Sequence, residues 1–175
     1  MKLSLVVPCY NEEENVQIFA ERAKKVLSGI DYELVFVNDG SKDGTIKELK
    51  KLACENVIVI DFSRNFGKEA GIFAGLSHAR GEYVVIIDAD LQQPVEVARE
   101  MYEFLEQNED YDQVAAYQDQ RKEGRIITWF KSAFYEMINK MCDIELYKNA
   151  SDFRCLRRNV VDAILSMTEY HRFSK

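Results

Sequence analysis

Short runs of β-branched and aromatic residues alternate with helical segments along the first 110 residues of the chain. Strands are predicted over residues 3–7, 32–37, 57–60 and 83–87, and helices over about 12–27, 43–53, 68–79 and 95–107. A strand followed by a helix and a second strand is the unit of a parallel sheet that helices cover on both faces. The alternation therefore predicts an α/β fold with a Rossmann-like, mostly parallel sheet.

The starts of three predicted helices carry residues that commonly cap or begin a helix. Asn11 is predicted to cap the first helix, and Asp43 or Ser41 the second, because their side chains accept hydrogen bonds from free backbone N–H groups. Pro94 is expected at the first position of the fourth helix, where its missing N–H costs nothing.

The third helix carries a glycine at every fourth position. Gly67, Gly71 and Gly75 would line one edge, and an edge without side chains lets a helix approach its neighbour closely. The segment is too short and too polar for a membrane span of ~20 residues, so we expect this edge to pack on the sheet rather than to form a membrane dimer.

The chain changes character after residue 118. Residues 113–117 are predicted to form a fifth strand, residues 153–156 a short extended piece and residues 159–167 a helix. Residues 125–142 have the pattern of an amphipathic helix rich in aromatic side chains. Such a helix either packs on the core or lies on a bilayer surface, and the sequence leaves both alternatives open.

Length and composition predict one folded domain over residues 1–175. Of the 175 residues, 47% are hydrophobic and 30% are charged, as in ordinary folded proteins. The net charge of −7 argues against nucleic acid as a partner. The four cysteines are scattered, which fits reduced thiols better than a disulfide framework or a zinc site.

Two carboxylates follow the predicted strand at 83–87. Asp88 and Asp90 would lie at the carboxyl end of that strand, which is where open α/β sheets bind their ligands. The alternative is a solvated turn whose aspartates cap the next helix. Two further strand ends, at residues 8–12 and 38–41, are expected at the same edge and favour a binding site over a simple turn.

The expected site is rich in carboxylates and lacks a phosphate loop. No Gly-x-Gly-x-x-Gly follows the first strand, and no Walker sequence occurs. Carboxylates cannot receive a phosphate directly, but they can hold a hard divalent cation that bridges to one. Asp90 and the amide oxygen of Gln92 are predicted ligands of Mg²⁺ or Mn²⁺, with water and a nucleoside diphosphate at the remaining positions. Asp39 is expected to accept hydrogen bonds from a base or a ribose.

Six segments together resemble the polyprenyl-phosphate branch of glycosyltransferase family 2, whose members have the GT-A fold and invert the anomeric carbon. They are PCYNEEEN, VNDGSKDGT, FSRNFGKEAG, DADLQQP, SDFR and EYHRF, and they occur in the family order from about Leu3 to Phe173. The branch includes dolichyl-phosphate mannose synthases and bactoprenol glucosyltransferases. The resemblance implies transfer of a hexose from a nucleotide sugar, UDP-glucose before GDP-mannose, to a polyprenyl phosphate such as undecaprenyl phosphate.

The resemblance also implies roles for individual residues. The nucleoside would be held by residues of the first two strand ends: Pro8, Tyr10, Glu12, Val37 and Asp39. The sugar diphosphate would be held by Asp88, Ala89 and Asp90, and the metal by Asp90 and Gln92. The catalytic residues would be Asp88, Asp90 and Asp152, the last as a base. Structural alternatives are loop packing for Pro8 and Tyr10, a helix N-terminal charge for Glu12 and a turn for Asp39.

The acceptor of that branch is a phosphate monoester rather than an alcohol. Its second pKa lies near ~6, so it is mostly a dianion at neutral pH and needs no strong base. Cations that bring two anions together are needed instead, and arginine holds a phosphate through two parallel hydrogen bonds. We therefore expect acceptor binding by Arg121, Lys131, Arg154 and Arg172, with solvated surface charge as the alternative. Asp152 would then orient Arg154 instead of acting as a base.

Two features depart from the family pattern. The family often has Arg-x-Asp-Arg where this chain has Gln118-Asp119-Gln120-Arg121, so only Arg121 matches. Relatives continue past the Arg-Phe element into membrane-associated helices, so we expect this chain to be truncated before them. No segment approaches the ~20 apolar residues of a spanning helix. The resemblance implies that the protein acts at the membrane surface, on the cytoplasmic face of the cell membrane. The sequence does not decide whether the protein forms a homo-oligomer.

Two other functions also stay open at this point. One is transfer to a hydroxyl of a growing polysaccharide, for which Asp152 would have to be a true base. The other is a weakly active module that binds or assembles nucleotide sugars, which the missing arginine at position 118 favours. A nucleotidyltransferase is disfavoured, because PCYNEEEN is not the glycine-rich phosphate loop expected after the first strand.

Overall fold

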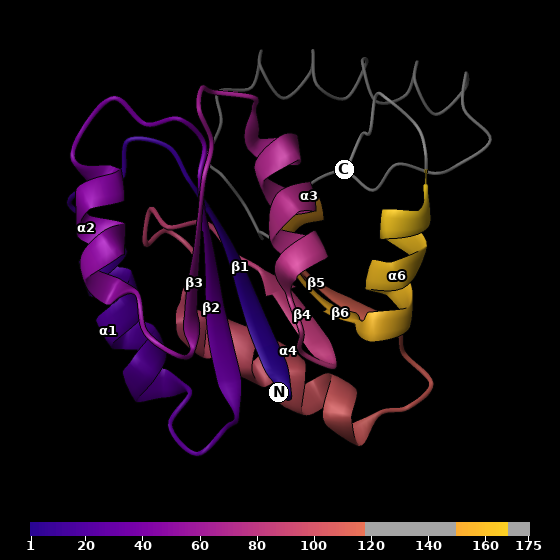
Figure 1. Ribbon diagram of the computed structural model, residues 1–175. Coiled ribbons are helices and arrows are strands. Elements are labelled where there is room, and N and C mark those ends of the chain that lie inside the picture. The colour runs from indigo at the N-terminus through magenta and orange to yellow at the C-terminus, as the bar shows by residue number, and fades with distance from the viewer. Residues whose placement is uncertain (118–149, 168–175) are drawn as a thin grey trace, which may run out of the picture.

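The computed structural model describes residues 1–117 and 150–167, which form an α/β unit with a six-stranded sheet (Figure 1). The strands are β1 (Leu3–Cys9), β2 (Tyr32–Asn38), β3 (Val57–Asp61), β4 (Tyr83–Ile86), β5 (Gln113–Tyr117) and β6 (Ala150–Arg157). Their order across the sheet is β3-β2-β1-β4-β6-β5. The amphipathic helix predicted at residues 125–142 lies outside the described residues.

Four strands form the predicted parallel part of the sheet. β1 pairs in parallel with β2 on one side and with β4 on the other, and β3 pairs in parallel with β2. The pairing of β1 with β4 ends at Val6 and Ile86, whereas β1 itself continues to Cys9. Pro8 lies in this overhang, where β4 no longer pairs with β1 and where a residue without an N–H is tolerated.

β6 is the main departure from the predicted topology. The short extended piece expected at residues 153–156 is an eight-residue strand, Ala150–Arg157, in the interior of the sheet. β6 runs antiparallel to both of its neighbours, with Arg154 opposite Ile86 of β4 and Ala115 of β5. Periodicity within a strand does not name its partners, because the pairing depends on packing between segments far apart in the chain.

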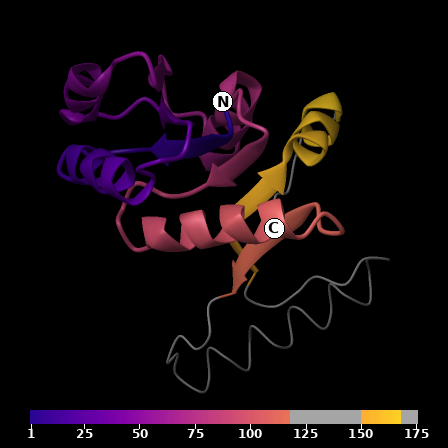
Figure 2. The same cartoon turned by 90° about the horizontal axis from the view of Figure 1, so that it is seen from below.

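The described helices cover both faces of the sheet, as predicted. They are α1 (Val16–Val26), α2 (Thr45–Leu52), α3 (Lys68–His78), α4 (Val95–Gln107) and α6 (Arg158–Ser166). α3 and α6 lie in front of the sheet in Figure 1 and α4 lies behind it, and Figure 2 shows α4 and α6 on opposite sides of β6. Within the described residues, no helix combines the length and the apolar character needed to cross a bilayer.

Alternate residues of the strands contribute to two core layers. In β1, Leu3, Leu5 and Val7 belong to the layer that contains the buried residues of α1 and α4, whereas Val6 belongs to the layer of α3. This period of two follows from strand geometry. Because both faces are covered, the strands of the parallel part are nearly continuous apolar runs, which is why they were recognisable in the sequence.

The helix starts differ from the predicted caps. Asn11 does not cap α1; it has a left-handed backbone (φ 56°) in the preceding loop, a conformation that asparagine tolerates better than most residues. Its Oδ1 accepts a hydrogen bond from Lys42 N at 2.9 Å and so ties two loops together. α2 begins at Thr45, whose N–H donates to Asp43, and Pro94 lies one position before α4.

Two of the three glycines predicted for the edge of α3, Gly71 and Gly75, pack on the sheet as predicted. Gly67 lies one residue before the helix, and apart from its chain neighbours no described residue lies within 4 Å of a Cβ atom placed there. A Cβ atom at Gly75 would lie 2.3 Å from Cγ1 of Val6, and one at Gly71 would lie 3.5 Å from Cβ of Pro8. The helix therefore approaches β1 more closely than a side chain at position 75 would permit.

A buried carboxylate connects the amino ends of the central strands. Glu33 of β2 is 0% exposed, and its oxygens accept hydrogen bonds from Ser4 Oγ at 2.7 Å, Arg80 N at 2.6 Å and the Arg80 guanidinium at 2.6 and 2.9 Å. Ser4 in turn accepts a hydrogen bond from Gly81 N. Burial alone would raise the pKa of Glu33, but these donors outweigh it and hold the pKa below its usual value.

Glu33→Gln should lower the free energy of unfolding at pH 7 by about 1–3 kcal/mol, because a neutral amide cannot accept the charge-assisted hydrogen bonds as strongly. The folded pKa lies below the usual 4.5, so the contribution of ionised Glu33 is complete above that value and is lost as the pH falls through the folded pKa. Urea unfolding should therefore show a difference between wild type and variant that narrows in acid.

Glu82→Gln is the control, since Glu82 pairs with Lys2 at the surface, where both side chains are exposed. It should change stability by less than ~0.5 kcal/mol. Equal losses for the two variants, or a loss in Glu33→Gln that does not depend on pH, would contradict the role given to the buried carboxylate.

Candidate active site

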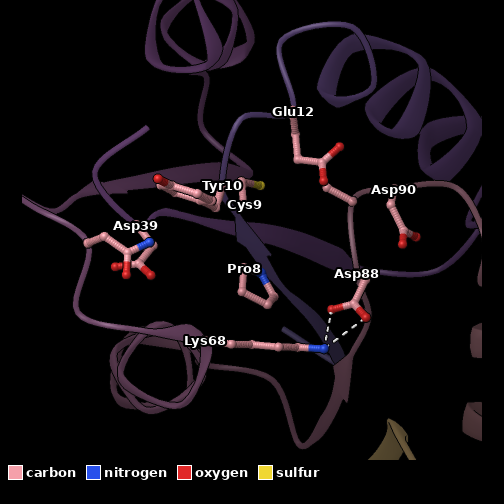
Figure 3. A pocket seen from close by; sticks show the side chains of 10 residues that line it. Pro8, Cys9, Tyr10, Glu12, Asp39, Lys68, Asp88 and Asp90 are labelled. Carbon is pink, nitrogen blue, oxygen red and sulfur yellow. Dashed lines mark hydrogen bonds and ion pairs between the residues drawn. The ribbon is translucent and has the colours of Figure 1, made fainter. Parts of the chain in front are cut away.

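A cleft of about 330 Å³ lies at the carboxyl edge of the parallel strands. It is lined by residues at the ends of β1, β2 and β4 and at the start of α3: Pro8, Cys9, Tyr10, Glu12, Asp39, Asn65, Lys68, Asp88, Ala89 and Asp90 (Figure 3). Ligand sites for small molecules commonly measure roughly 300–1,000 Å³. The predicted convergence of three strand ends in one site is therefore confirmed.

The end of β1 contributes one wall of the cleft. The side chain of Tyr10 is exposed, whereas Pro8 and Cys9 are buried. The Cys9 thiol donates to a backbone carbonyl of β1, and burial raises the pKa of Cys9 well above its usual value. Because a thiol must ionise to become a nucleophile, Cys9 is a packing residue here. Glu12 accepts a hydrogen bond from the side-chain amide of Asn15 at 2.7 Å.

Asp39 follows β2 and is only 4% exposed. Its Oδ1 accepts a hydrogen bond from Phe66 N at 2.6 Å, and its Oδ2 accepts one from Gly67 N at 2.9 Å. The carboxylate thus anchors the loop before α3, and further lone pairs remain available for a base or a ribose. Val37 does not line the cleft; it is fully buried beside the glycine edge of α3, so the structure places its side chain in the core.

The turn after β4 holds Asp88, Ala89 and Asp90 at the cleft. Gln93, which sequence reasoning missed, brackets Asp88: its Oε1 accepts a hydrogen bond from Asp88 N at 3.0 Å, and its Nε2 donates to Asp88 Oδ2 at 3.1 Å. Asp90 Oδ1 accepts a hydrogen bond from Gln92 N at 3.0 Å. The turn therefore positions both carboxylates through its own hydrogen bonds.

Lys68 is a second residue that sequence reasoning missed. Its Nζ lies 2.7 Å from Asp88 Oδ1, 2.8 Å from Asp88 Oδ2 and 3.3 Å from Asp152 Oδ2 (Figure 3 shows the contacts with Asp88). Burial alone would lower the pKa of Lys68, but the hydrogen bonds and charges of Asp88 and Asp152 outweigh it and raise the pKa. The sequence contained a signal for this residue. Lys68 follows Gly67 at a predicted helix start, and this start comes soon after the end of the predicted strand at 57–60, which lies at the same edge of the sheet.

Asp152 comes from β6 and lies near Asp88, with which it shares Lys68. Its Oδ2 pairs with Lys68, and its Oδ1 is buried without a hydrogen-bond partner among the described residues. Asp152 is thus a counter-ion of Lys68 in this structure. Arg154 lies two residues further along the same strand, and residues at this spacing share one face of a sheet. The orientation of Arg154 by Asp152 stays a prediction.

The remaining acceptor residues lie outside the described part of the chain. They are Arg121, Lys131 and Arg172. Their roles, like the consequences of Gln118 in place of an arginine, stay predictions.

The oxygen atoms after β4 fit a hard divalent cation. The hydrogen bond from Gln92 N occupies only part of the acceptor capacity of Asp90, and the side chain of Gln92 is exposed. No group of three or more His, Cys, Asp or Glu residues is arranged to hold a metal within residues 1–117 and 150–167. Mg²⁺ is commonly held by one or two carboxylates, with water and substrate phosphates as its other ligands, so a sparse protein ligand set is compatible with it.

The sequence matches known proteins over nearly its whole length. The model of the family "Glycosyl transferase family 2" matches residues 4–165. CsbB of Bacillus subtilis (strain 168), which its name describes only as a glycosyltransferase, is 43% identical over 177 residues, covering 99% of this chain and 53% of CsbB. A prophage bactoprenol glucosyl transferase homolog of Escherichia coli (strain K12) is 40% identical over 179 residues, covering 100% of this chain and 58% of the relative. The chain thus spans little more than half the length of these relatives.

Solved structures share the fold. S. aureus TarS 1-349 superimposes with a TM-score of 0.66 at 21% identity, covering 94% of this chain and 49% of the TarS chain. The mannosyltransferase PcManGT from Pyrobaculum calidifontis was solved in complex with GDP-Man and Mn²⁺. It superimposes with a TM-score of 0.68 at 20% identity, and the match covers 93% of this chain and 46% of the PcManGT chain. At these identities the likeness concerns the fold alone, and it confirms the expected GT-A fold. With the sequence match over residues 4–165, it follows that the chain belongs to glycosyl transferase family 2.

Proposed function

We propose that the chain is the catalytic part of an inverting glycosyltransferase that moves a hexose from a nucleotide diphosphate sugar to a polyprenyl phosphate. UDP-glucose is the favoured donor, ahead of GDP-mannose, and undecaprenyl phosphate is the favoured acceptor. The observation that carries the proposal is the cleft in which Asp88 and Asp90 meet Pro8, Tyr10 and Asp39. The relatives named as bactoprenol glucosyl transferases support both the sugar and the lipid.

The two ends of the donor would lie against different walls of the cleft. Tyr10 offers an exposed aromatic ring on which a base can pack, and Asp39 offers oxygens for a base or a ribose. Asp88, Ala89 and Asp90 would then face the sugar diphosphate. This arrangement leaves the nucleoside beside β1 and β2 and the reacting carbon near β4.

Asp90 and Gln92 would hold Mg²⁺ or Mn²⁺ through oxygen atoms. When bound, the metal supplies positive charge that stabilises the departing diphosphate. Asp88 would face the sugar, because its carboxylate is already positioned by Lys68 and Gln93. A carboxylate with fixed orientation can align sugar hydroxyls for attack on the anomeric carbon.

The acceptor chemistry needs no proton transfer. An oxygen of the phosphate dianion attacks the anomeric carbon opposite the diphosphate, so the new C–O bond forms as the bond to the leaving group breaks and the configuration inverts. The ion pair of Asp152 with Lys68 supports this interpretation, because it gives Asp152 a role as a counter-ion that involves no proton transfer. A polysaccharide hydroxyl would instead require Asp152 to accept a proton.

A polyprenyl phosphate resides in a membrane, so the cleft would work at a membrane surface, on the cytoplasmic face where nucleotide sugars are made available. Arg154 is the described candidate for contact with the lipid phosphate, and its position on β6 near Asp152 supports that role. Arg121, Lys131 and Arg172 are the further candidates.

Transfer can be tested directly. Protein incubated with labelled UDP-glucose, Mn²⁺ or Mg²⁺ and undecaprenyl phosphate in detergent should form a labelled lipid, and a chelator should abolish the product. GDP-mannose in parallel compares the donors, and a related bactoprenol glucosyl transferase provides the positive control. Labelled polysaccharide in place of labelled lipid would overturn the acceptor, and donor binding without transfer would favour the nucleotide-sugar binding module.

Asp90→Ala should weaken Mn²⁺-dependent binding of UDP, measured by calorimetry. The loss should be at least about tenfold, because even residues that only support a metal ligand contribute that much to metal affinity. Asp110→Ala removes an exposed aspartate in the turn after α4 and should leave the affinity unchanged. Equal affinities in wild type and Asp90→Ala would rule out Asp90 as a metal ligand.

A further inference from the structure

Asp88 and Asp152 lie close together where β4 ends beside β6, because both contact the same lysine. Ile86 lies opposite Arg154 in the register of these strands. Asp88 follows the end of β4 by two residues, and Asp152 precedes Arg154 by two residues on β6, so both lie just past the last paired residues of the two strands. Two carboxylates held close together repel each other, so a cation between them stabilises the arrangement.

Lys68 supplies that cation. Its Nζ contacts both oxygens of Asp88, at 2.7 and 2.8 Å, and Oδ2 of Asp152 at 3.3 Å. Among the described residues that line the cleft, Lys68 is the one cation, beside the four carboxylates of Glu12, Asp39, Asp88 and Asp90. One ammonium group therefore joins the carboxylate of the donor side to the carboxylate that β6 brings to the site.

The surroundings of Lys68 hold its backbone in place. Asp39 accepts hydrogen bonds from Phe66 N and Gly67 N, which immediately precede Lys68. Gly40 has φ 62°, and a Cβ atom there would lie 2.3 Å from the carbonyl carbon of Arg64, so the loop before α3 packs directly against the end of β2. The bare edge of α3 then rests on β1. These contacts fix the start of α3, from which the side chain of Lys68 extends to Asp88 after β4 and to Asp152 on β6.

We propose that Lys68 is a positioning residue for sugar transfer, which holds Asp88 and Asp152 in one arrangement by acting as their shared counter-ion. The inference rests on the proposed function, because it assigns Asp88 to the donor half and Asp152 to the acceptor half. Through Asp88, Lys68 orients the group that faces the sugar. Through Asp152, it fixes the strand that carries Arg154 toward the acceptor.

A shared counter-ion also predicts an effect on metal binding that needs no turnover. Lys68 occupies both oxygens of Asp88 and places a positive charge beside the expected metal ligands. Removing that charge makes the site more negative and releases Asp88, so Mn²⁺ alone should bind more tightly. A residue that merely supported the fold would weaken binding or leave it unchanged.

The decisive comparison uses Lys68→Met, which keeps most of the length of the side chain and removes its charge. We expect kcat for lipid-linked sugar formation to fall by about 10²-fold, the loss that a misplacement of reacting groups by ~1 Å can cause, while KM for the donor changes much less. Lys68→Arg should recover part of kcat, since it restores the charge with a different geometry. In direct titration, Lys68→Met should bind Mn²⁺ severalfold more tightly than wild type.

Lys51→Met is the matched control. Lys51 forms a surface pair with Glu48 on α2, with Nζ 2.6 Å from Oε1, and should change neither kcat nor Mn²⁺ affinity when replaced. Thermal unfolding of each variant identifies any loss that arises from misfolding. In the Asp152→Asn background, Lys68→Met should reduce kcat by less than in wild type, because the two residues act through one contact.

Wild-type kcat in Lys68→Met, or strictly multiplicative losses in the double variant, would overturn the positioning role. Mn²⁺ binding by Lys68→Met that is unchanged or weaker than in wild type would overturn the role of Lys68 as a shared counter-ion. These outcomes are separate from failure of the proposed function. If wild type transfers no sugar to the lipid while Lys68→Met still binds Mn²⁺ more tightly, the acceptor assignment is wrong and the pairing of Lys68 with Asp88 stands.

Discussion

The antiparallel pairing of β4 with β6 is the contact on which the candidate site depends. Parallel strands bring only their own carboxyl ends to one edge of a sheet, and here those ends line the cleft. Because β6 runs the other way, its first residues reach that same edge beside the end of β4. Asp152 therefore meets Asp88 although the two are far apart in the chain. A sixth strand in parallel orientation would have carried Asp152 to the opposite edge.

The placement of α3 is the second requirement of the site. A helix that carried side chains along its sheet-facing edge would stand further from β1, as the contact of Gly75 with Val6 makes plain. Asp39 fixes the preceding loop through two backbone N–H groups and so has a structural task besides any contact with a nucleoside. The position of Lys68 depends on the close packing of α3 and on the anchored loop before it. Lys68 is the first residue of α3, so these two contacts determine that its Nζ lies within 2.8 Å of Asp88.

The carboxylates at the two edges of the sheet differ in how fully they are hydrogen-bonded. At the amino edge, Glu33 is surrounded by donors from Ser4 and Arg80, as expected of a group that stabilises the fold. At the carboxyl edge, Asp152 keeps one buried oxygen without a partner in the described part of the chain, and it shares Lys68 with a second carboxylate, Asp88. Unfavourable local arrangements of this kind are typical of functional sites, where stability is given up for chemistry.

The amino-acid sequence by itself determined the parallel strands, the covering helices and the strand ends that line the cleft, because continuous apolar runs, helical periodicity and strand-end carboxylates are local patterns. Family resemblance added Asp152 and Arg154 but not their neighbours. Only the tertiary structure decided that β6 lies inside the sheet, that Asn11 bridges loops instead of capping α1, that Val37 is in the core, and that Lys68 and Gln93 hold Asp88. The physical reason is common to these cases: strand partners and side-chain contacts arise between segments distant in sequence, where no local periodicity records them.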